Sequence, residues 1–144
     1  MQPFRIIIIG ARTQYAVKVS PEDYEWLIGF KWTFAVSHKN GGLVYARRSV
    51  RSGDSNVTVL MHREIIEKRM GQARPSERHF VDHANGDSLD NRRVNDAGAP
   101  QLRWLTAKEN MANQRGIIQR PLDAAALAQL AAIGVPDPGA GIPF

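Results

Sequence analysis

Cysteine is absent from the 144-residue sequence. The chain can therefore form neither a disulfide bond nor a thiolate zinc site, and it has no cysteine nucleophile. Long hydrophobic runs are scarce near the N-terminus, where four consecutive isoleucines at residues 6–9 are followed at once by Gly10. A membrane-spanning helix needs about 20 apolar residues, and the profile of a secretory leader is missing. We therefore expect a soluble protein that is not exported and has no membrane partner.

Acidic residues are outnumbered by basic ones, at 14 Asp and Glu against 19 Lys and Arg, which gives a formal net charge of +5. The basic residues cluster in residues 46–51, 63–69 and 92–120. Clusters of this kind favour nucleic acid as the partner. A basic surface that is merely solvated is the alternative. The length suits one domain, which would bury roughly two thirds of its unfolded surface.

The first half of the sequence predicts a small antiparallel sheet with a short helix. β-Branched and alternating residues at 4–9 and 13–19, separated by a glycine-containing turn, are typical of a hairpin. A helix is expected next, because Ser20 is a suitable N-cap, Pro21 suits the first turn and Gly29 suits the end. Further strands are expected at residues 31–38, 43–50 and 57–60, followed by a helix over residues 61–70.

The second half of the sequence predicts a strand, a turn, a strand and a helix. The strands are expected at residues 79–83 and 102–105. The helix then begins near Thr106, which can form a capping box with Glu109. A last helix is expected within residues 120–136, with an apolar stripe formed by Leu122, Leu127, Leu130 and Ile133.

Together these elements indicate an α+β fold. We expect a β-rich N-terminal region over residues 1–70 that binds DNA, a motif-bearing region over residues 71–118, and a C-terminal helix with a loose tail over residues 119–144. The first boundary is placed at the polar loop of residues 71–78, because no other stretch separates the two halves as clearly.

One polar segment carries the functional signal: residues 81–95 have the sequence VDHANGDSLDNRRVN. Asp82 offers an anionic oxygen and Asn110 an amide oxygen, and phosphate and water can complete the octahedron that Mg²⁺ prefers. His83 would serve as general base, because an imidazole with a pKa near ~6.5 is largely neutral at cellular pH. Neighbours on a regular strand point to opposite faces, so Asp82 and His83 share a site only if the strand bends or ends there. The turn-forming pair Asn85-Gly86 follows directly.

The same residues allow other interpretations of this segment. A solvated β-turn also contains Asp-His beside Asn-Gly, and that alternative stays open. A calcium loop fails, because Ala84 and Gly86 occupy positions that must supply oxygen ligands. A zinc finger is disfavoured, because the histidines lack both thiolate partners and the usual spacing. His62 falls within the apolar arc of its helix, which favours a hydrogen-bonded core histidine over a catalytic one.

Three segments together resemble a known family. MHREI at residues 61–65, the segment 81–95, and LRWLTAKENMANQR at residues 102–115 are similar to the HNH endonucleases of the phage and intron-homing type. The resemblance extends over residues 4–115 and implies the ββα-metal fold. The N-terminal half also resembles, more loosely, the three-strand-plus-helix DNA-binding domain of the plant ethylene-response-factor type. A sheet that only buttresses the nuclease core is the alternative there.

The resemblance implies a metal-dependent enzyme that hydrolyses phosphodiester bonds in double-stranded DNA. Asp82 matches the metal-binding acid, His83 the general base, and Asn110 the helix residue that completes the metal site. The implied cofactor is Mg²⁺, or Mn²⁺ in its place, without structural zinc. The implied setting is the cytoplasm of a bacterial or phage-infected cell, and the protein would act as a monomer or as a homodimer.

The middle asparagine of the family motif is displaced in this sequence. Family members usually have Asn directly before LRW, whereas here Asn95 is followed by DAGAPQ before Leu102. We favour Asn95 as the catalytic asparagine, with residues 96–101 looping out, because the inserted Asp, Gly and Pro are loop formers. Gln101, which directly precedes LRW, is the alternative.

The remaining polar residues are expected to support the site or to contact DNA. Asn91 is expected to close the turn after the first strand. Asn113 shares a helical face with Asn110, which makes it a backup ligand or a DNA contact. The residues expected to bind nucleic acid are Arg47, Arg48, Arg92, Arg93 and Arg103.

Two other functions stay open on the sequence. A DNA-binding regulator or architectural protein with a degenerate HNH site would keep the basic surface, and the displaced asparagine favours it. A structural or phage-assembly protein is compatible with the positive charge, but it has no use for the polar constellation of residues 81–95.

Overall fold

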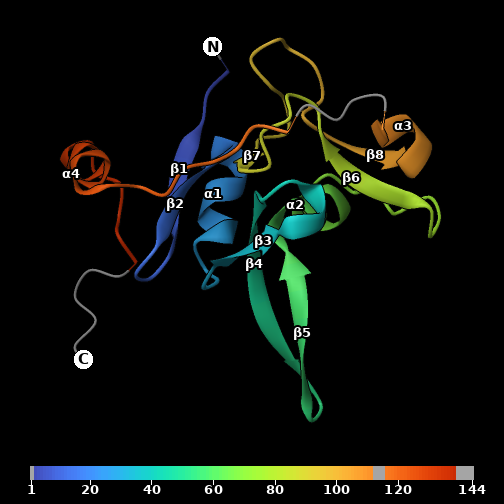
Figure 1. The fold of residues 1–144 in the computed structure, drawn as a ribbon, viewed down its shortest axis with the longest axis horizontal. Coiled ribbons are helices and arrows are strands. Elements are labelled where there is room, and N and C mark those ends of the chain that lie inside the picture. Colours follow the sequence, from blue (N-terminus) through green and yellow to red (C-terminus); the bar gives the residue numbers. More distant parts are fainter. Residues whose placement is uncertain (1, 112–115, 139–144) are drawn as a thin grey trace.

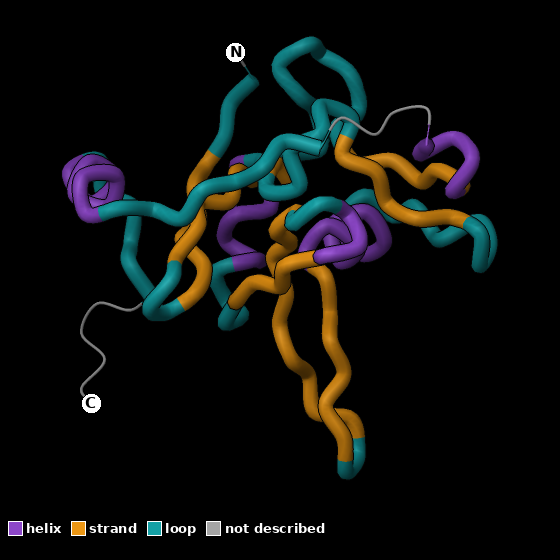
Figure 2. The backbone as a smooth tube through the Cα atoms, viewed as in Figure 1, coloured by secondary structure: helices purple, strands orange, loops and turns teal. Residues whose placement is uncertain are grey.

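A computed structural model describes residues 2–111 and 116–138 of the chain. This part has the mixed α+β fold expected from the sequence, with small sheets and short helices (Figures 1 and 2). Within it the strands form two three-stranded sheets and one two-stranded ribbon. Asn113, the predicted backup ligand, lies outside the described residues.

The first sheet joins the N-terminal hairpin to a short strand from the polar segment. Strands β1 (Arg5–Gly10) and β2 (Gln14–Val19) pair antiparallel, as the alternation of their residues predicted. Gly10 has a φ of +94°, and a side chain there would collide with the carbonyl of Thr13, so the turn requires glycine. Strand β7 (Asp90–Asn91) pairs in parallel with the other edge of β2. That pairing fixes the polar segment against the N-terminal half.

Helix α1 (Pro21–Leu27) begins where the sequence predicted, but its cap differs from the expectation. Ser20 stands at the N-cap position and makes no side-chain capping bond. Its hydroxyl instead accepts a hydrogen bond from the backbone N–H of Arg93, at 2.9 Å. The expectation of a Ser20 cap was wrong because a long-range partner uses the hydroxyl, which thereby links α1 to the polar segment.

The second sheet consists of β3 (Thr33–Ser37), β4 (Leu43–Ser52) and β5 (Ser55–Leu60), with a short 3₁₀ turn between the first two strands. Its pairing is antiparallel throughout. The hairpin of β4 and β5 extends beyond the body of the molecule, and residues 51–58 are all exposed (Figure 1). Both strands are longer than predicted, because polar residues around the turn pair without any contact to the core.

The helix predicted over residues 61–70 divides into two kinds of helix. Helix α2 (Met61–Glu64) continues into a π-helical turn (Ile65–Arg69). In that turn the N–H of Met70 donates to the carbonyl of Ile65, five residues earlier, at 2.9 Å. The apolar side chains of both parts are buried, as the sequence pattern predicted.

The ribbon of β6 (His79–His83) and β8 (Leu102–Thr106) is followed by helix α3 (Ala107–Met111). The predicted capping box is confirmed. Thr106 donates its backbone N–H to Glu109 Oε1 at 3.0 Å, and the N–H of Glu109 donates to Thr106 Oγ1 at 3.3 Å. Strand, strand and helix thus follow one another as predicted, with β7 of the first sheet intervening in the sequence.

Helix α4 (Ala124–Ala132) lies at the outside of the molecule (Figure 1). Asp123 caps it by accepting a hydrogen bond from the N–H of Ala126 at 2.8 Å. The helix was predicted, yet none of its residues is buried, and Ile133 is 74% exposed. Among the described residues, 2–111 and 116–138, no helix has the length and apolar character needed to cross a membrane.

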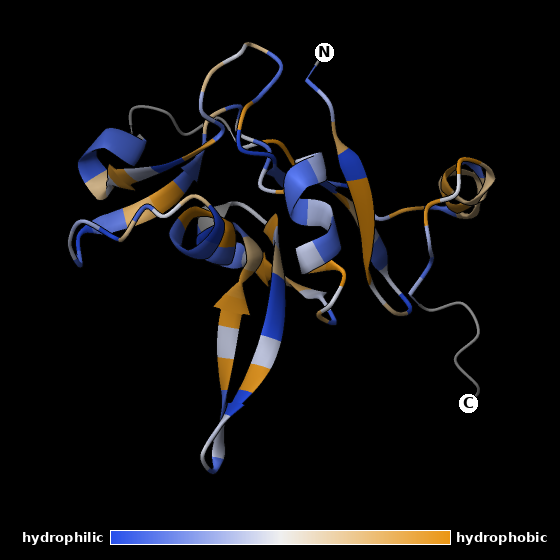
Figure 3. Cartoon of the chain, turned by 180° about the vertical axis from the view of Figure 1, so that it is seen from behind, coloured by the Kyte–Doolittle hydropathy of each residue, from blue (hydrophilic) through white to orange (hydrophobic). Residues whose placement is uncertain are grey.

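The hydrophobic core joins both halves of the chain. Isoleucines and valines of β1 and β2 pack with Leu27 of α1 and Met61 of α2, and Figure 3 shows apolar residues along the strands in orange. Leu89 and Leu102, which come from the polar segment and from β8, belong to the same cluster. The expected boundary at residues 71–78 stays a prediction, and core contacts cross it.

Candidate active site

His83 is the last residue of β6 and is only 7% exposed. Its Nε2 lies 2.8 Å from Oδ1 of Asn91, a fully buried residue of β7. Because that amide oxygen accepts the hydrogen bond, Nε2 carries the proton and Nδ1 keeps a lone pair. Burial lowers the pKa of His83, against the opposing influence of Asn91 and of nearby carboxylates that include Asp82. His83 is therefore a neutral imidazole near pH 7, as a general base requires.

Two aromatic side chains cover the His83 ring. The ring of His62 meets it edge-on, with centroids 5.0 Å apart, and the ring of Tyr45 lies 6.1 Å away. His62 is buried, as predicted, but in the described part of the chain its Nδ1 has no hydrogen-bond partner. Burial lowers the pKa of His62, and the nearby charges of His83 and Arg63 lower it further. The helix pattern identified His62 as buried but gave no sign that it lies against the candidate base.

Asp82 leaves β6 on the face opposite to His83. It pairs across the ribbon with Arg103, whose Nε lies 3.0 Å from Asp82 Oδ2. The pairing is regular through His83, and the strand ends there, because the N–H of Gly86 donates to the His83 carbonyl in a tight turn. The condition that the strand ends at this point is met. Asp82 and His83 thus lie together at the end of the strand, on its opposite faces, and that they share one site stays a prediction.

The turn after His83 is held by two side-chain amide groups, those of Gln101 and Asn85. Gln101 is fully buried and donates from Nε2 to Asn85 Oδ1 at 2.7 Å and to the Asp90 carbonyl at 3.0 Å. Asn85 in turn accepts a hydrogen bond from the N–H of Asp87 at 2.9 Å. Gly86 has a φ of +80°, which the turn requires and other residues adopt at a cost. The position of His83 thus depends on Gln101.

Residues 96–101 were predicted to loop out, and those up to Pro100 do, in a loop that the bridge between Val94 and Pro100 closes, whereas Gln101 is fully buried. Asn95 Oδ1 accepts hydrogen bonds from the N–H groups of Ala97 and Ala99, and Asn95 Nδ2 donates to Gln101 Oε1 at 3.3 Å. The side chain of Asn95 therefore holds the insertion and reaches the turn only through Gln101. A catalytic role for Asn95 stays a prediction. The geometry favours Gln101 as the residue that supports the turn after His83.

Arg92 and Arg93, which were both expected at DNA, form ion pairs inside the protein. Arg92 is 2% exposed and donates two hydrogen bonds to the carboxylate of Asp90, with a further ion pair to Asp96 at 2.7 Å. Arg93 binds the buried carboxylate of Asp23 at 2.6 Å. A phosphate contact by either guanidinium would require it to leave these carboxylates.

Gln119, in the segment before α4, joins the polar segment to β4. Gln119 Oε1 accepts the N–H of Val44 at 3.1 Å, while its Nε2 donates to Asp87 Oδ1 at 3.0 Å and to Ser88 Oγ at 2.8 Å. Ser88 also donates its hydroxyl to the carbonyl of Val44. Gln119 therefore holds residues 87 and 88 against β4. No sequence signal distinguished Gln119 from an ordinary polar loop residue.

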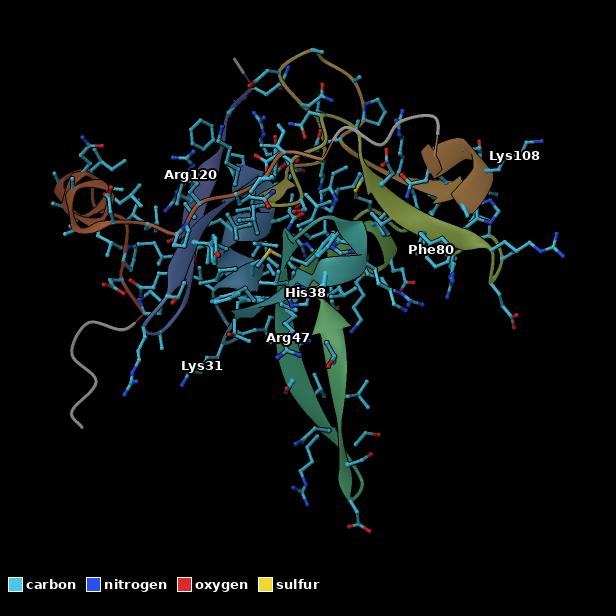
Figure 4. The ribbon with its side chains drawn as sticks, in the orientation of Figure 1. Lys31, His38, Arg47, Phe80, Lys108 and Arg120 are labelled. Atoms are coloured by element: carbon cyan, nitrogen blue, oxygen red, sulfur yellow. The ribbon has the colours of Figure 1, made fainter. Side chains whose placement is uncertain are left out.

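A cleft of about 670 Å³ opens between the second sheet and the β6–β8 ribbon. Asn110 of α3 lines it together with His62, Tyr45, Arg74 and His79. The guanidinium of Arg74 donates only to backbone carbonyls within the described residues, so no carboxylate neutralises it there. Figure 4 labels Phe80, which also lines this cleft from β6. The cleft thus brings Asn110 and His62 into one space with unneutralised positive charge.

Arg47 and Arg48 leave β4 on opposite faces of the second sheet. Arg48 makes an ion pair with Glu64 at 3.0 Å and stacks over the ring of Phe30 at 3.9 Å, so it links the sheet to α2. Arg47 has no ion pair in the described part of the chain, and it lies near the base of the projecting hairpin (Figure 4). Arg47 shares its face with Tyr45, which lines the cleft.

Most of the residues that line the cleft lie in a region of the chain that is similar to a known family, whereas the lining residues of β3 and β4 lie outside it. Residues 59–112 match the family model described as HNH endonuclease. The match covers α2, both strands of the ribbon, the polar segment and α3, and it suggests nuclease activity on nucleic acid. HNH nucleases generally use a divalent metal. Residues 1–58 lie outside the match, so the ethylene-response-factor resemblance is not confirmed.

Neither the curated proteins nor the solved structures contain a match to this chain.

Proposed function

We propose that the protein is a divalent-metal-dependent DNA endonuclease of the HNH homing type. The observation that carries the proposal is the neutral, buried imidazole of His83, which Asn91 orients at the end of a strand within the region similar to HNH endonucleases. The proposed products are a 5′-phosphate and a 3′-hydroxyl. Strand, strand and helix, as β6, β8 and α3, correspond in this proposal to a ββα-metal site.

His83 acts on water in the proposed reaction. Its Nδ1 takes a proton from a water molecule, the water oxygen forms a bond to phosphorus, and the bond from phosphorus to O3′ breaks. The leaving O3′ then takes a proton from solvent. The imidazolium that forms is stabilised by the carboxylates of Asp82, Asp87 and Asp90, which all raise the pKa of His83.

Asp82 and Asn110 are the residues that would hold the metal. Their oxygens suit a hard cation, and in the described part Asp82 has only the Arg103 bond to Oδ2, which leaves Oδ1 available. No group of three or more His, Asp or Glu able to hold a metal occurs among the described residues, so water and phosphate would supply the other ligands. When bound, the cation would stabilise negative charge on the phosphate and the leaving oxygen.

The ligand assignment predicts how single variants respond to Mg²⁺. Asp82→Asn and Asn110→Ala are each expected to raise the Mg²⁺ concentration needed for half-maximal cleavage by about 10–100-fold or more. Loss of a residue that only supports a metal ligand already weakens metal binding by that factor. Asn113→Ala removes the alternative ligand, and it should leave that Mg²⁺ concentration unchanged if Asn110 holds the metal. Cleavage rates over a Mg²⁺ titration measure this. If Asn113→Ala removed cleavage and Asn110→Ala did not, the assignment of Asn110 would be wrong.

The projecting hairpin supplies the proposed duplex-binding face. On one face, Arg47, Ser49 and Arg51 of β4 alternate with residues that point to the other side, and Thr58 pairs opposite Ser49. The opposite face carries the apolar pair Val50 and Val57. A two-stranded ribbon fits the major groove, and the polar face of this hairpin leads toward the cleft through Tyr45. Arg103 completes the proposed DNA contacts beside Asp82, while Arg48, Arg92 and Arg93 remain in the fold.

Neighbouring residues of β5 offer a test of this face. Thr58→Glu places a negative charge on the polar face and is expected to weaken duplex binding at low salt about tenfold, which is ~1.4 kcal/mol. Val57→Glu adds the same charge on the other face, where Val57 is 47% exposed, and should weaken binding by less than about threefold. Fluorescence anisotropy with a labelled duplex in EDTA measures both. Equal losses would show that the hairpin does not present this face to DNA.

One observation favours a second function, a DNA-binding regulator with a degenerate site. The ion pair between Asp82 and Arg103 competes with a metal for the same carboxylate. If Arg103 holds Asp82 permanently, the protein binds duplex DNA without cutting it. Arg103→Gln then separates the two functions, because it frees the carboxylate of Asp82. A rise in the cleavage rate of this variant would show that the ion pair blocks the metal.

A further inference from the structure

His62 occupies a buried position that costs stability unless something binds there. The side chain is 6% exposed, and its Nδ1 has no partner among the described residues. A buried donor or acceptor without a hydrogen bond costs about 1–3 kcal/mol, so an apolar ring of the same size would suit an ordinary core better. The polar ring is explained if Nδ1 binds a ligand, and His62 lines the cleft that would admit one.

The surroundings of His62 indicate the charge of that ligand. Arg63, Arg74 and His79 line the same cleft, and none of the described residues that line it is acidic. Arg63 pairs with Glu67 outside the cleft, whereas Arg74 donates to backbone carbonyls and lies over the Phe80 ring, with no carboxylate partner among the described residues. The electrostatic environment therefore favours an anion.

The distance from His62 to His83 indicates which anion. The two ring centroids are 5.0 Å apart, and Tyr45 contacts both rings. A phosphorus atom attacked by water within hydrogen-bond reach of His83 lies next to His62 as well. Asn110, the proposed metal ligand, lines the same cleft.

We propose that His62 is a catalytic residue whose ring N–H donates a hydrogen bond to a non-bridging oxygen of the scissile phosphodiester. The inference rests on the proposed endonuclease function and adds a residue to it. His62 holds the phosphate in line with the water at His83, and the hydrogen bond strengthens as negative charge develops on that oxygen. Loss of one such donor typically costs about 10²–10³-fold in rate.

Replacement by phenylalanine separates this role from packing. His62→Phe keeps an aromatic ring against Tyr45 and His83 but removes both nitrogens. We expect an unchanged or higher melting temperature, unchanged duplex affinity within about threefold, and a kcat reduced about 100-fold. His62→Gln, which retains an N–H donor, should recover at least about tenfold of that loss. His38→Phe is the matched control, because His38 is exposed and lies outside the proposed site, and it should cleave normally.

A binding readout tests the contact without cleavage. In EDTA, addition of a duplex oligonucleotide should shift the ring ¹⁵N resonances of His62 saturably and leave those of His38 in place. If His62→Phe cleaves at the wild-type rate, or if the His62 resonances do not respond to duplex, the proposal is overturned while the endonuclease function stands. If the wild type does not cleave but its His62 resonances shift, the phosphate contact stands and the endonuclease function falls.

Discussion

Replacing His83 by alanine is expected to lower the rate of DNA cleavage at neutral pH by about 10²–10⁴-fold, the contribution that a positioned general base typically makes. The expectation follows from three properties of the residue. It is buried, burial lowers its pKa so that the ring is neutral, and its hydrogen bond to Asn91 leaves Nδ1 free to accept a proton. Single-turnover nicking of supercoiled plasmid in Mg²⁺ measures the rate.

Two controls keep the result interpretable. His38→Ala removes an exposed histidine and should cleave as the wild type does. The glutamine in His83→Gln fills most of the space of the imidazole ring, so the packing against His62 and Tyr45 is less disturbed than in the alanine variant. A loss of activity in this variant therefore reports the loss of the base. Duplex binding in EDTA and circular dichroism should match the wild type for the glutamine variant. A folded His83→Gln protein that cleaves within about threefold of the wild-type rate would contradict the assignment of the base.

Replacing Arg92 by methionine is expected to lower the free energy of unfolding by about 3–5 kcal/mol, the usual cost of removing one partner from a buried ion pair. Arg92 and Asp90 are each 2% exposed at the side chain, and their closest atoms are 2.7 Å apart. Without the guanidinium, the carboxylate of Asp90 stays buried, and among the described residues it keeps only neutral donors, the side chain of Asn85 and the backbone N–H of residue 92. Total stabilities of single domains are about 5–15 kcal/mol, so this single change removes much of the margin. Urea unfolding measures the loss.

An exposed arginine and a double variant provide the matched comparisons. Arg12→Met removes the same charge from the exposed turn between β1 and β2 and should change stability by less than about 0.5 kcal/mol. Asp90→Leu combined with Arg92→Met should be more stable than Arg92→Met alone, because no unpaired charge remains buried. Unchanged stability of Arg92→Met together with weakened duplex binding would return Arg92 to the DNA surface, where the sequence alone had placed it.

Local sequence signals predicted most of the secondary structure. The alternating runs that form β1 and β2, the Thr106 and Glu109 capping box, and strand β6 all depend on residues within a few positions of one another. The candidate base His83 was chosen from its place between a strand and an Asn-Gly turn, together with the resemblance to HNH endonucleases. Such signals are sufficient where the stabilising partners are close in sequence.

The predictions that failed or were missed depend on long-range partners. Ser20 binds the backbone of Arg93 instead of capping its helix, and Asn91 supports His83 because β7 pairs with β2. His62 meets His83 through the packing of α2 against the ribbon, which no periodicity encodes. Gln101 reaches the turn only because the insertion closes on itself. Each of these contacts becomes visible only once the sheets and the ribbon are assembled.

The most direct test of the central claim is incubation of the purified chain with supercoiled plasmid in Mg²⁺ and, in parallel, in EDTA. The account predicts relaxed and then linear DNA in Mg²⁺ alone, with 5′-phosphate and 3′-hydroxyl ends that a ligase can rejoin. The same incubation with folded His83→Gln protein should leave the plasmid supercoiled. Intact plasmid under both conditions, with duplex binding retained, would contradict the account and identify the protein as a DNA-binding regulator.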